Sequence, residues 1–261
     1  MVFRKLLHST HATDRVVSTF DQDSSSSIPQ PVKLQFSQQG FVRFLSFLLL
    51  ILVVLHTIGL IDRYILGDTS WFPETLFDLD TEYNIPSYIS SLLLLACSAA
   101  LFLIGIVKQQ QQDQFRRYWQ FLSLVFFCLA ADEVLSLHEK SIEPLRRFLH
   151  TDGFLYFAWV IPASILVALL FLSYLSFLKR LPSDVRAGIL LAGGLYIAGG
   201  LGMELLGGWW DDVYDINNLP YALITTVEEV LELIGVSLFL VTLISYTRSN
   251  IQEVRLSFIR R

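Results

Sequence analysis

Six long apolar runs constrain the fold of this chain more than any other feature of its sequence. They cover residues 41–62, 86–107, 118–138, 154–178, 188–206 and 220–246. A bilayer core of about 30 Å is crossed by roughly 20 apolar residues in a helix, so each run is long enough to span it. Only 16% of the residues are charged, whereas charged residues make up about a quarter of an ordinary soluble domain. The sequence therefore predicts an all-α fold, a polytopic transmembrane helix bundle with six spans.

The segments outside these runs predict three parts and an orientation. Residues 1–40 are polar, lack a period that could bury a face, and are predicted to form a disordered cytoplasmic N-terminal tail. A six-helix transmembrane domain over 41–246 and a short basic cytoplasmic C-terminal tail over 247–261 would follow. Fifteen of the 19 Lys and Arg residues fall in the tails with the first-span entrance, or in the 108–117 and 179–186 loops. Because positive charge collects on the cytoplasmic side, both termini are predicted to be cytoplasmic.

The composition gives no support to nucleic-acid binding or to a thiol-based framework. The formal net charge is −5, so a nucleic acid is not an expected partner. The two cysteines, Cys97 and Cys128, lie in apolar runs, where a thiol behaves as a small hydrophobe. The lipid bilayer is the partner that the composition predicts.

Ionisable residues interrupt three of the apolar runs at one depth. A charge at the bilayer centre costs roughly 2.5–3.5 kcal/mol, so its presence asks for a partner or a use. In the predicted orientation the outer halves of the third, fifth and sixth spans carry Asp132, Glu133, Glu204, Glu228, Glu229 and Glu232, with His138 and Glu139 at the outer mouth. His56 and Ser136 lie in the same layer and are possible additional members. We therefore predict one outward-facing acidic pocket.

Ideal helix geometry sorts these residues by face. At about 100° per residue, two stripes are expected to face the pocket, one of Asp132, Ser136 and Glu139, the other of Glu228, Glu232 and Gly235. The same geometry turns Glu133, Glu229 and His138 toward other sides of their helices. On the fifth span it aligns Gly193, Gly200, Glu204 and Gly207 in a groove that a neighbouring backbone could approach closely.

Several carboxylates in one dry pocket cannot all be ionised without cations, so protons or a bound cation should be shared among them. A divalent metal ion is the possible cofactor, since carboxylates with an imidazole suit Mn, Fe, Zn or Ca. Its candidate ligands are Asp132, Glu133, His138, Glu204, Glu228 and Glu232. With only two histidines in or at the spans, a three-histidine zinc site is excluded.

Two other motifs favour unremarkable roles. The loop "DLDTEY" spaces Asp78, Asp80 and Glu82 like the start of a calcium loop, but Tyr83 stands where the glycine belongs. A solvated acidic loop is the favoured interpretation. Cys128 and Ser136 have no local base at suggestive spacing apart from His138, so nucleophilic catalysis is disfavoured.

Five segments carry a resemblance to a known family: "LFDLDTEYNIPSYISSLLLL", "ADEVLSLHE", "YFAWVIP", "GMELLGG" and "TVEEVLELIG". Together they resemble an uncharacterised family of bacterial, notably cyanobacterial, six-span membrane proteins with DE-x4-HE and EE-x2-E intramembrane motifs. The resemblance covers about residues 41–246 and implies six spans, but carries no activity. It also implies a bacterial inner membrane or a thylakoid-type membrane as the location.

Three functions stay open at this stage. The leading hypothesis is an integral membrane protein whose acidic and histidine pocket binds protons or a cation while moving a small solute or ion. The alternative is a metal-dependent membrane enzyme acting on a lipid-like substrate that arrives laterally. A structural or assembly protein without turnover is the third.

Overall fold

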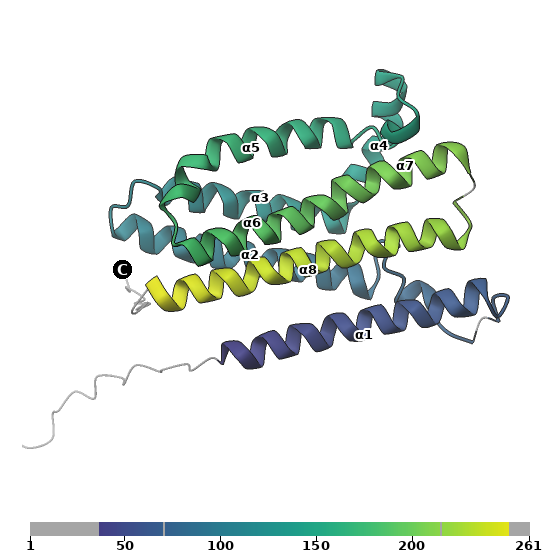
Figure 1. Ribbon diagram of the computed structural model, residues 1–261, viewed down its shortest axis with the longest axis horizontal. Coiled ribbons are helices and arrows are strands. Elements are labelled where there is room, and N and C mark those ends of the chain that lie inside the picture. Colours follow the sequence, from purple (N-terminus) through teal and green to yellow (C-terminus); the bar gives the residue numbers. More distant parts are fainter. Residues whose placement is uncertain (1–36, 70, 215, 251–261) are drawn as a thin grey trace, which may run out of the picture. The chain divides into compact units, whose positions relative to one another are not determined.

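The computed structural model describes residues 37–69, 71–214 and 216–250. All regular elements in this part are helical (Figure 1). The α-helices are α1 (Gln38–Tyr64), α2 (Ile85–Gln110), α3 (Arg116–Leu135), α4 (Leu137–Leu149), α5 (Val160–Arg180), α6 (Ser183–Ile197), α7 (Glu204–Val213) and α8 (Leu219–Asn250). Short helical turns η1 (Glu74–Leu76) and η2 (Gly153–Leu155) lie in the loops, and the π-helical segment η3 (Ala198–Met203) joins α6 to α7.

Five segments are long and apolar enough to cross a bilayer, which supports the prediction of a multi-pass helical membrane protein. They are α1, α2, α3, α5 and the continuous run of α6, η3 and α7. The 32-residue helix α8 is not among them, and Glu228, Glu229 and Glu232 interrupt its first half. The six-span count and the cytoplasmic placement of the termini stay predictions.

The predicted tails fall largely outside the described residues. Residues 1–36 and 251–261 are not described, so the two tails are untested there. Where the description begins, α1 starts at Gln38, with Ser37 Oγ accepting a hydrogen bond from Gly40 N at 3.2 Å. At the other end, α8 continues to Asn250, past the predicted end of the sixth span.

The local sequence explains where α2 begins. Asn84 Oδ1 accepts a hydrogen bond from Ser87 N at 3.1 Å, and Ser87 Oγ accepts one from Asn84 N at 3.1 Å. This reciprocal capping satisfies amides that the first turn leaves unpaired. Pro86 sits in that turn, where no intrahelical amide bond is needed. The capped start fixes the acidic loop before α2 against the bundle.

Two predicted span boundaries are wrong. The third span was expected to run through His138, but Ser136 adopts a left-handed backbone (φ 48°, ψ 47°) and ends α3 at Leu135. Because such a residue cannot continue a right-handed helix, the chain restarts as α4. The fourth span was expected from residue 154, but η2 and a turn precede α5, which begins at Val160.

The π-helical segment changes the register of the α6–α7 run, and Gly193 does not take part in the groove predicted from Gly193, Gly200, Glu204 and Gly207. Gly200 faces the Glu232 carboxylate of α8, whereas a Cβ built on Gly193 would meet nothing within 4 Å. An added residue per turn rotates everything beyond it relative to an ideal helix. Sequence periodicity alone could not anticipate this rotation.

The two ends of the bundle differ in packing. We call the end with the described residues Lys108, Arg116, Arg117, Lys179, Arg180 and Arg186 the basic end, and the opposite end, where α3 stops and α8 starts, the acidic end. Toward the basic end lies an aromatic layer, defined as Tyr118, Trp119, Tyr174, Phe177 and Tyr246. Within it, the Trp119 ring centroid lies 4.9 Å from those of both Phe177 and Tyr246. These rings pack on one another between α3, α5 and α8 at this level of the bundle.

Helix neighbours place the acidic groups together. In the described part of the chain, α2 packs on α3, α6 packs on α8, and α8 also contacts α1, α2 and α7. The acidic halves of α3, α7 and α8 therefore surround a common space. The loop between α1 and α2 covers it from the chain's acidic end.

Candidate acidic cavity

A cavity of about 400 Å³ opens at the acidic end of the bundle. All eight acidic and histidine residues predicted for the pocket line it: Asp132, Glu133, His138, Glu139, Glu204, Glu228, Glu229 and Glu232. The structure thus brings together the residues that the sequence predicted. Their roles as ligands or proton carriers stay predictions.

The expected directions of four residues are wrong. Glu133, Glu229 and His138 were expected to point away from the pocket, yet all three line the cavity. The cavity is wide enough to receive side chains from more than one face of each helix, and the turn at Ser136 re-aims the start of α4. Ser136 itself is 2% exposed and is not among the cavity-lining residues.

His56, the other possible member, does not line the cavity either. Its Nδ1 accepts the backbone N–H of Leu79 at 3.1 Å, and its Nε2 lies 2.8 Å from Thr226 Oγ1. Nδ1 also lies 3.4 Å from Asp78 Oδ1. His56 is 2% exposed. It ties the loop to α1 and α8 and has no free nitrogen for a ligand.

Asp80 and Glu82 were not predicted to belong to the pocket. Both line the cavity, which they reach from the loop between α1 and α2. This loop was interpreted as a solvated acidic segment, but Asn84 Nδ2 donates to Asp78 O at 2.6 Å and to Thr75 O at 3.2 Å, folding it back onto the bundle. The calcium-loop-like spacing of Asp78, Asp80 and Glu82 was one signal in the sequence, and Asn84 two residues after Glu82 was another.

His138 and Asp132 form an oriented pair across the α3–α4 junction. Asp132 Oδ2 lies 2.7 Å from His138 Nδ1, and Asp132 Oδ1 accepts the His138 backbone N–H at 3.0 Å. Burial would lower the pKa of His138, but the hydrogen bond and charge of Asp132, together with Glu204 and Glu139, raise it to about 9. With Nδ1 held by Asp132, the other nitrogen is left for the cavity.

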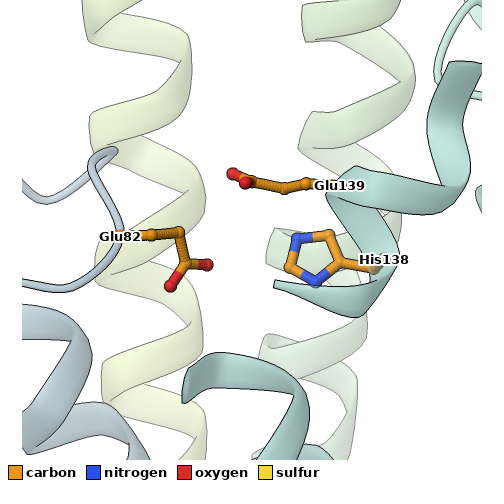
Figure 2. Close-up of side chains that lie close together, drawn as sticks. All are labelled: Glu82, His138 and Glu139. Carbon is orange, nitrogen blue, oxygen red and sulfur yellow. The ribbon is translucent and has the colours of Figure 1, made fainter. Parts of the chain in front are cut away.

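Glu82, His138 and Glu139 converge at the mouth of the cavity, and we call them the mouth triad. Each offers one ligand atom, and these atoms all lie within 4.8 Å of one another. Figure 2 shows the two carboxylates and the imidazole directed toward a shared space, Glu82 from the loop and the others from α4. Glu82 Oε2 is buried and has no hydrogen-bond partner among the described residues. A cation at this point would give that oxygen a partner.

Burial and neighbouring negative charges raise the pKa values of two carboxyl groups in the loop. Burial, followed by the charges of Glu133 and Glu139, raises the pKa of Glu82 to about 7. Burial and the charge of Asp78 raise the pKa of Asp80 to about 6. Both side chains therefore gain from a nearby cation.

The deeper carboxylates are held by neutral partners. Trp159 Nε1 donates a hydrogen bond to Glu204 Oε1 at 2.8 Å. The side chain of Ser90 is hydrogen-bonded to Glu133, and that of Tyr196 to Glu232. No Lys or Arg appears among the described residues that line the cavity, and His138 is its sole basic group there. The cavity therefore holds a large excess of acid over base.

The fold and the cavity define the class: a helical, multi-pass membrane protein with an acidic cavity at one end of its bundle. Within that class, the chain matches the family described as "Domain of unknown function (DUF8692)" over residues 43–246, and it belongs to this family. This agrees with the resemblance to an uncharacterised family, whose bacterial origin stays an expectation. No curated protein and no solved structure matches the chain.

Proposed function

We propose that this protein is a metal-dependent membrane enzyme that binds one divalent cation in the mouth triad. The observation that carries the proposal is the convergence of three ligand atoms within 4.8 Å of one another, one from each of Glu82, His138 and Glu139. It moves the centre of the predicted metal site from the deep carboxylates to the mouth. It also replaces most of the predicted ligands, keeping only His138 and adding Glu82 and Glu139.

The ligand chemistry supports a transition metal. One imidazole with two carboxylates suits Mn²⁺, Fe²⁺ or Zn²⁺ better than an all-oxygen calcium site. Asp132 at Nδ1 is the outer-shell partner that ligating histidines usually have, because it fixes the ring and its tautomer. Three protein ligands leave coordination positions open, as catalytic sites require. A metal held there supplies Lewis acidity and an acidified water.

The packing of the basic half favours an enzyme over a transporter. A transporter needs a second route from the cavity to the opposite side, and that direction is filled by the aromatic layer. Trp119 is 1% and Phe177 2% exposed, and their rings meet edge to face. Transport of a solute or ion would require this layer to open. A cavity used from one side needs no such movement.

The test is metal analysis of the purified full chain. The protein in mild detergent is stripped with a chelator, dialysed against Mn²⁺, Zn²⁺ or Ca²⁺ and measured by elemental mass spectrometry. We expect about one equivalent of Mn²⁺ or Zn²⁺, reduced at least tenfold in His138→Ala and Glu82→Gln. Substitution of a residue that only supports a ligand already lowers metal affinity by about 10–100-fold, so loss of a ligand itself should lower it at least tenfold.

Glu143→Gln is the matched control, since Glu143 lies on the same short helix but pairs with Arg147 at 2.7 Å. This variant should keep its metal. Binding that is equal in His138→Ala and the parent would show that the cation sits elsewhere, and the proposal would fail. No metal in the parent would favour proton sharing or a purely structural cluster.

A further inference from the structure

We propose that the cavity takes up a long-chain amine from the bilayer, with the ammonium among the deep carboxylates and the hydrocarbon chain between α5 and α6. The inference rests on the proposed function in using the same cavity and names the substrate class for it. It depends on the two kinds of wall that the cavity has. One wall is acidic, and the other is apolar and faces the lipid side.

The apolar wall comes from three helices at one depth. Leu129 of α3, Ala163 and Val167 of α5, and Ile197 of α6 all line the cavity. At about 1.5 Å per residue, Leu129, Val167 and Ile197 each lie roughly 20 Å from the basic end of their helix. They form an apolar floor below the carboxylates. A hydrocarbon chain can lie there without meeting a charge.

The middle of α5 is less buried than its ends. Val160 and Tyr174 are buried, but no residue between them is, within the part of the chain that the structure describes. Ile165, Leu166 and Leu169 are 57–67% exposed on this stretch. The helix is thus anchored at its ends and borders the cavity in between. A ligand could pass from the lipid beside this stretch.

Glycines on α6 and η3 show which side is closed and which is open. On the α8 side, a Cβ on Gly199 would lie 2.7 Å from Glu228 O, so this seam is tightly packed. Gly193, one turn before Ile197 on the same face, would meet nothing within 4 Å, and neither would Gly194. Ala163 and Val167 of α5 line the same cavity as Ile197 of α6, so we place its opening between α5 and α6. Ile197 itself is 39% exposed while lining the cavity, as expected at an opening.

The charge of the acidic wall selects the head group. The mouth triad would use Glu82, His138 and Glu139, and Asp132 holds the other nitrogen of His138. Glu204, Glu228 and Glu232 therefore lie deeper in the cavity with no Lys or Arg among the described lining residues. Glu204 is 8% exposed and aims its carboxylate into this space beside Trp159. A phosphate or carboxylate head would be repelled here. An ammonium would pair with the acids and could face the rings of Trp159 and Tyr221.

The test is photolabelling of the full chain in phosphatidylcholine nanodiscs. The probe is hexadecylamine carrying a mid-chain diazirine, and labelled peptides are mapped by mass spectrometry. We expect labels on α5 around Ala163 and Val167, competed by unlabelled hexadecylamine but not by hexadecanol or butylamine. If hexadecanol does not compete with the probe, binding needs the positive charge. If butylamine does not compete, binding needs the long hydrocarbon chain.

Two α6 variants provide the matched comparison. Gly193→Phe fills the open space and should reduce labelling at least fivefold. Leu191→Phe, on the opposite face of α6, where Leu191 is 59% exposed, should leave labelling unchanged. Glu228→Gln combined with Glu232→Gln should remove the preference for the amine over the alcohol. Labels confined to lipid-facing residues, or equal competition by the alcohol, would overturn the inference.

The two proposals fail separately. His138→Ala should lose the metal but keep photolabelling, whereas Gly193→Phe should keep the metal and lose photolabelling. Metal in the parent without amine-dependent labelling would refute only the substrate class. Labelling without metal would refute only the metal site.

Discussion

At the scale of single residues, the Asp132–His138 pair makes the stability of the metal-free protein depend on pH. Burial alone would lower the pKa of His138, but the hydrogen bond and the charge of Asp132 raise it from 6.5 to about 9 in the folded state. A raised folded pKa contributes stability that is fully present below the unfolded value and is lost as pH rises through the folded value. In chelator, the parent should therefore lose thermal stability between about pH 6.5 and 9 relative to Asp132→Asn.

The same pair can be followed directly. The His138 ring protons should titrate near pH 9 by NMR in the metal-free parent, and distinctly lower in Asp132→Asn, because the hydrogen bond and the charge are both removed. An unchanged midpoint in the variant would show that Asp132 does not hold the imidazole. The stability difference between parent and variant should then be flat with pH.

His56 is expected to be structural, in contrast to His138. His56→Ala would leave the buried N–H of Leu79 without an acceptor, which costs about 1–3 kcal/mol in addition to the lost packing. Denaturant unfolding in mild detergent should show this loss, while the metal content stays at the parental level. Loss of the metal with unchanged stability would make His56 a ligand instead.

The residues of the cavity were largely predictable because charge in an apolar run is a strong signal, and independent helices carried it to one depth. Direction was less predictable: Glu133 and Glu229 line the cavity although an ideal helix turns them aside. Glu82 was missed because its loop lacks a period, and only tertiary folding brings it beside His138.

At the scale of helices, the close contact between α6 and α8 depends on glycines, which have no side chain. A Cβ on Gly235 would lie 2.8 Å from Tyr196 N and 2.9 Å from Ala192 O, and these backbone atoms cannot move alone. Gly235→Ala should therefore destabilise the protein by about 1–3 kcal/mol through overpacking. Gly193→Ala, with open space beside it, should be neutral or stabilise by up to about 1 kcal/mol.

Unfolding of the two variants by the same denaturant measures this contrast. Equal stabilities would mean that α6 and α8 are not in close backbone contact, and the account of the closed side would be wrong. Aggregation of Gly235→Ala, but not of Gly193→Ala, would agree with a loss of contact between α6 and α8.

The apolar runs predicted the existence of the helices better than their ends. Run length alone predicts a span, but a serine within an apolar run gives no sign of the left-handed backbone that Ser136 adopts. The π-helical segment was also hidden, because an ideal period was assumed through residues 198–203. Both irregularities border the cavity and re-aim its residues.

For the whole molecule, the aromatic layer on the basic side of the acidic cavity predicts access to this cavity from one side only. The two native cysteines, buried Cys97 and exposed Cys128, are first replaced so that the reagent reacts only with the introduced thiol. Glu228→Cys then reports the cavity, and Gln111→Cys reports the exposed loop at the basic end. If positive charge faces the cytoplasm, a cationic membrane-impermeant thiol reagent should label Glu228→Cys on intact spheroplasts and Gln111→Cys only after permeabilisation.

Each other pattern has a definite meaning. Labelling of Gln111→Cys alone on intact spheroplasts would reverse the predicted orientation while keeping the one-sided cavity. Labelling of Glu228→Cys from both sides, with Gln111→Cys reached from one, would show a route through the aromatic layer. That route requires Trp119 and Phe177 to separate, so a Trp119→Ala variant should widen it, and transport would then replace the enzyme as the better account of the cavity.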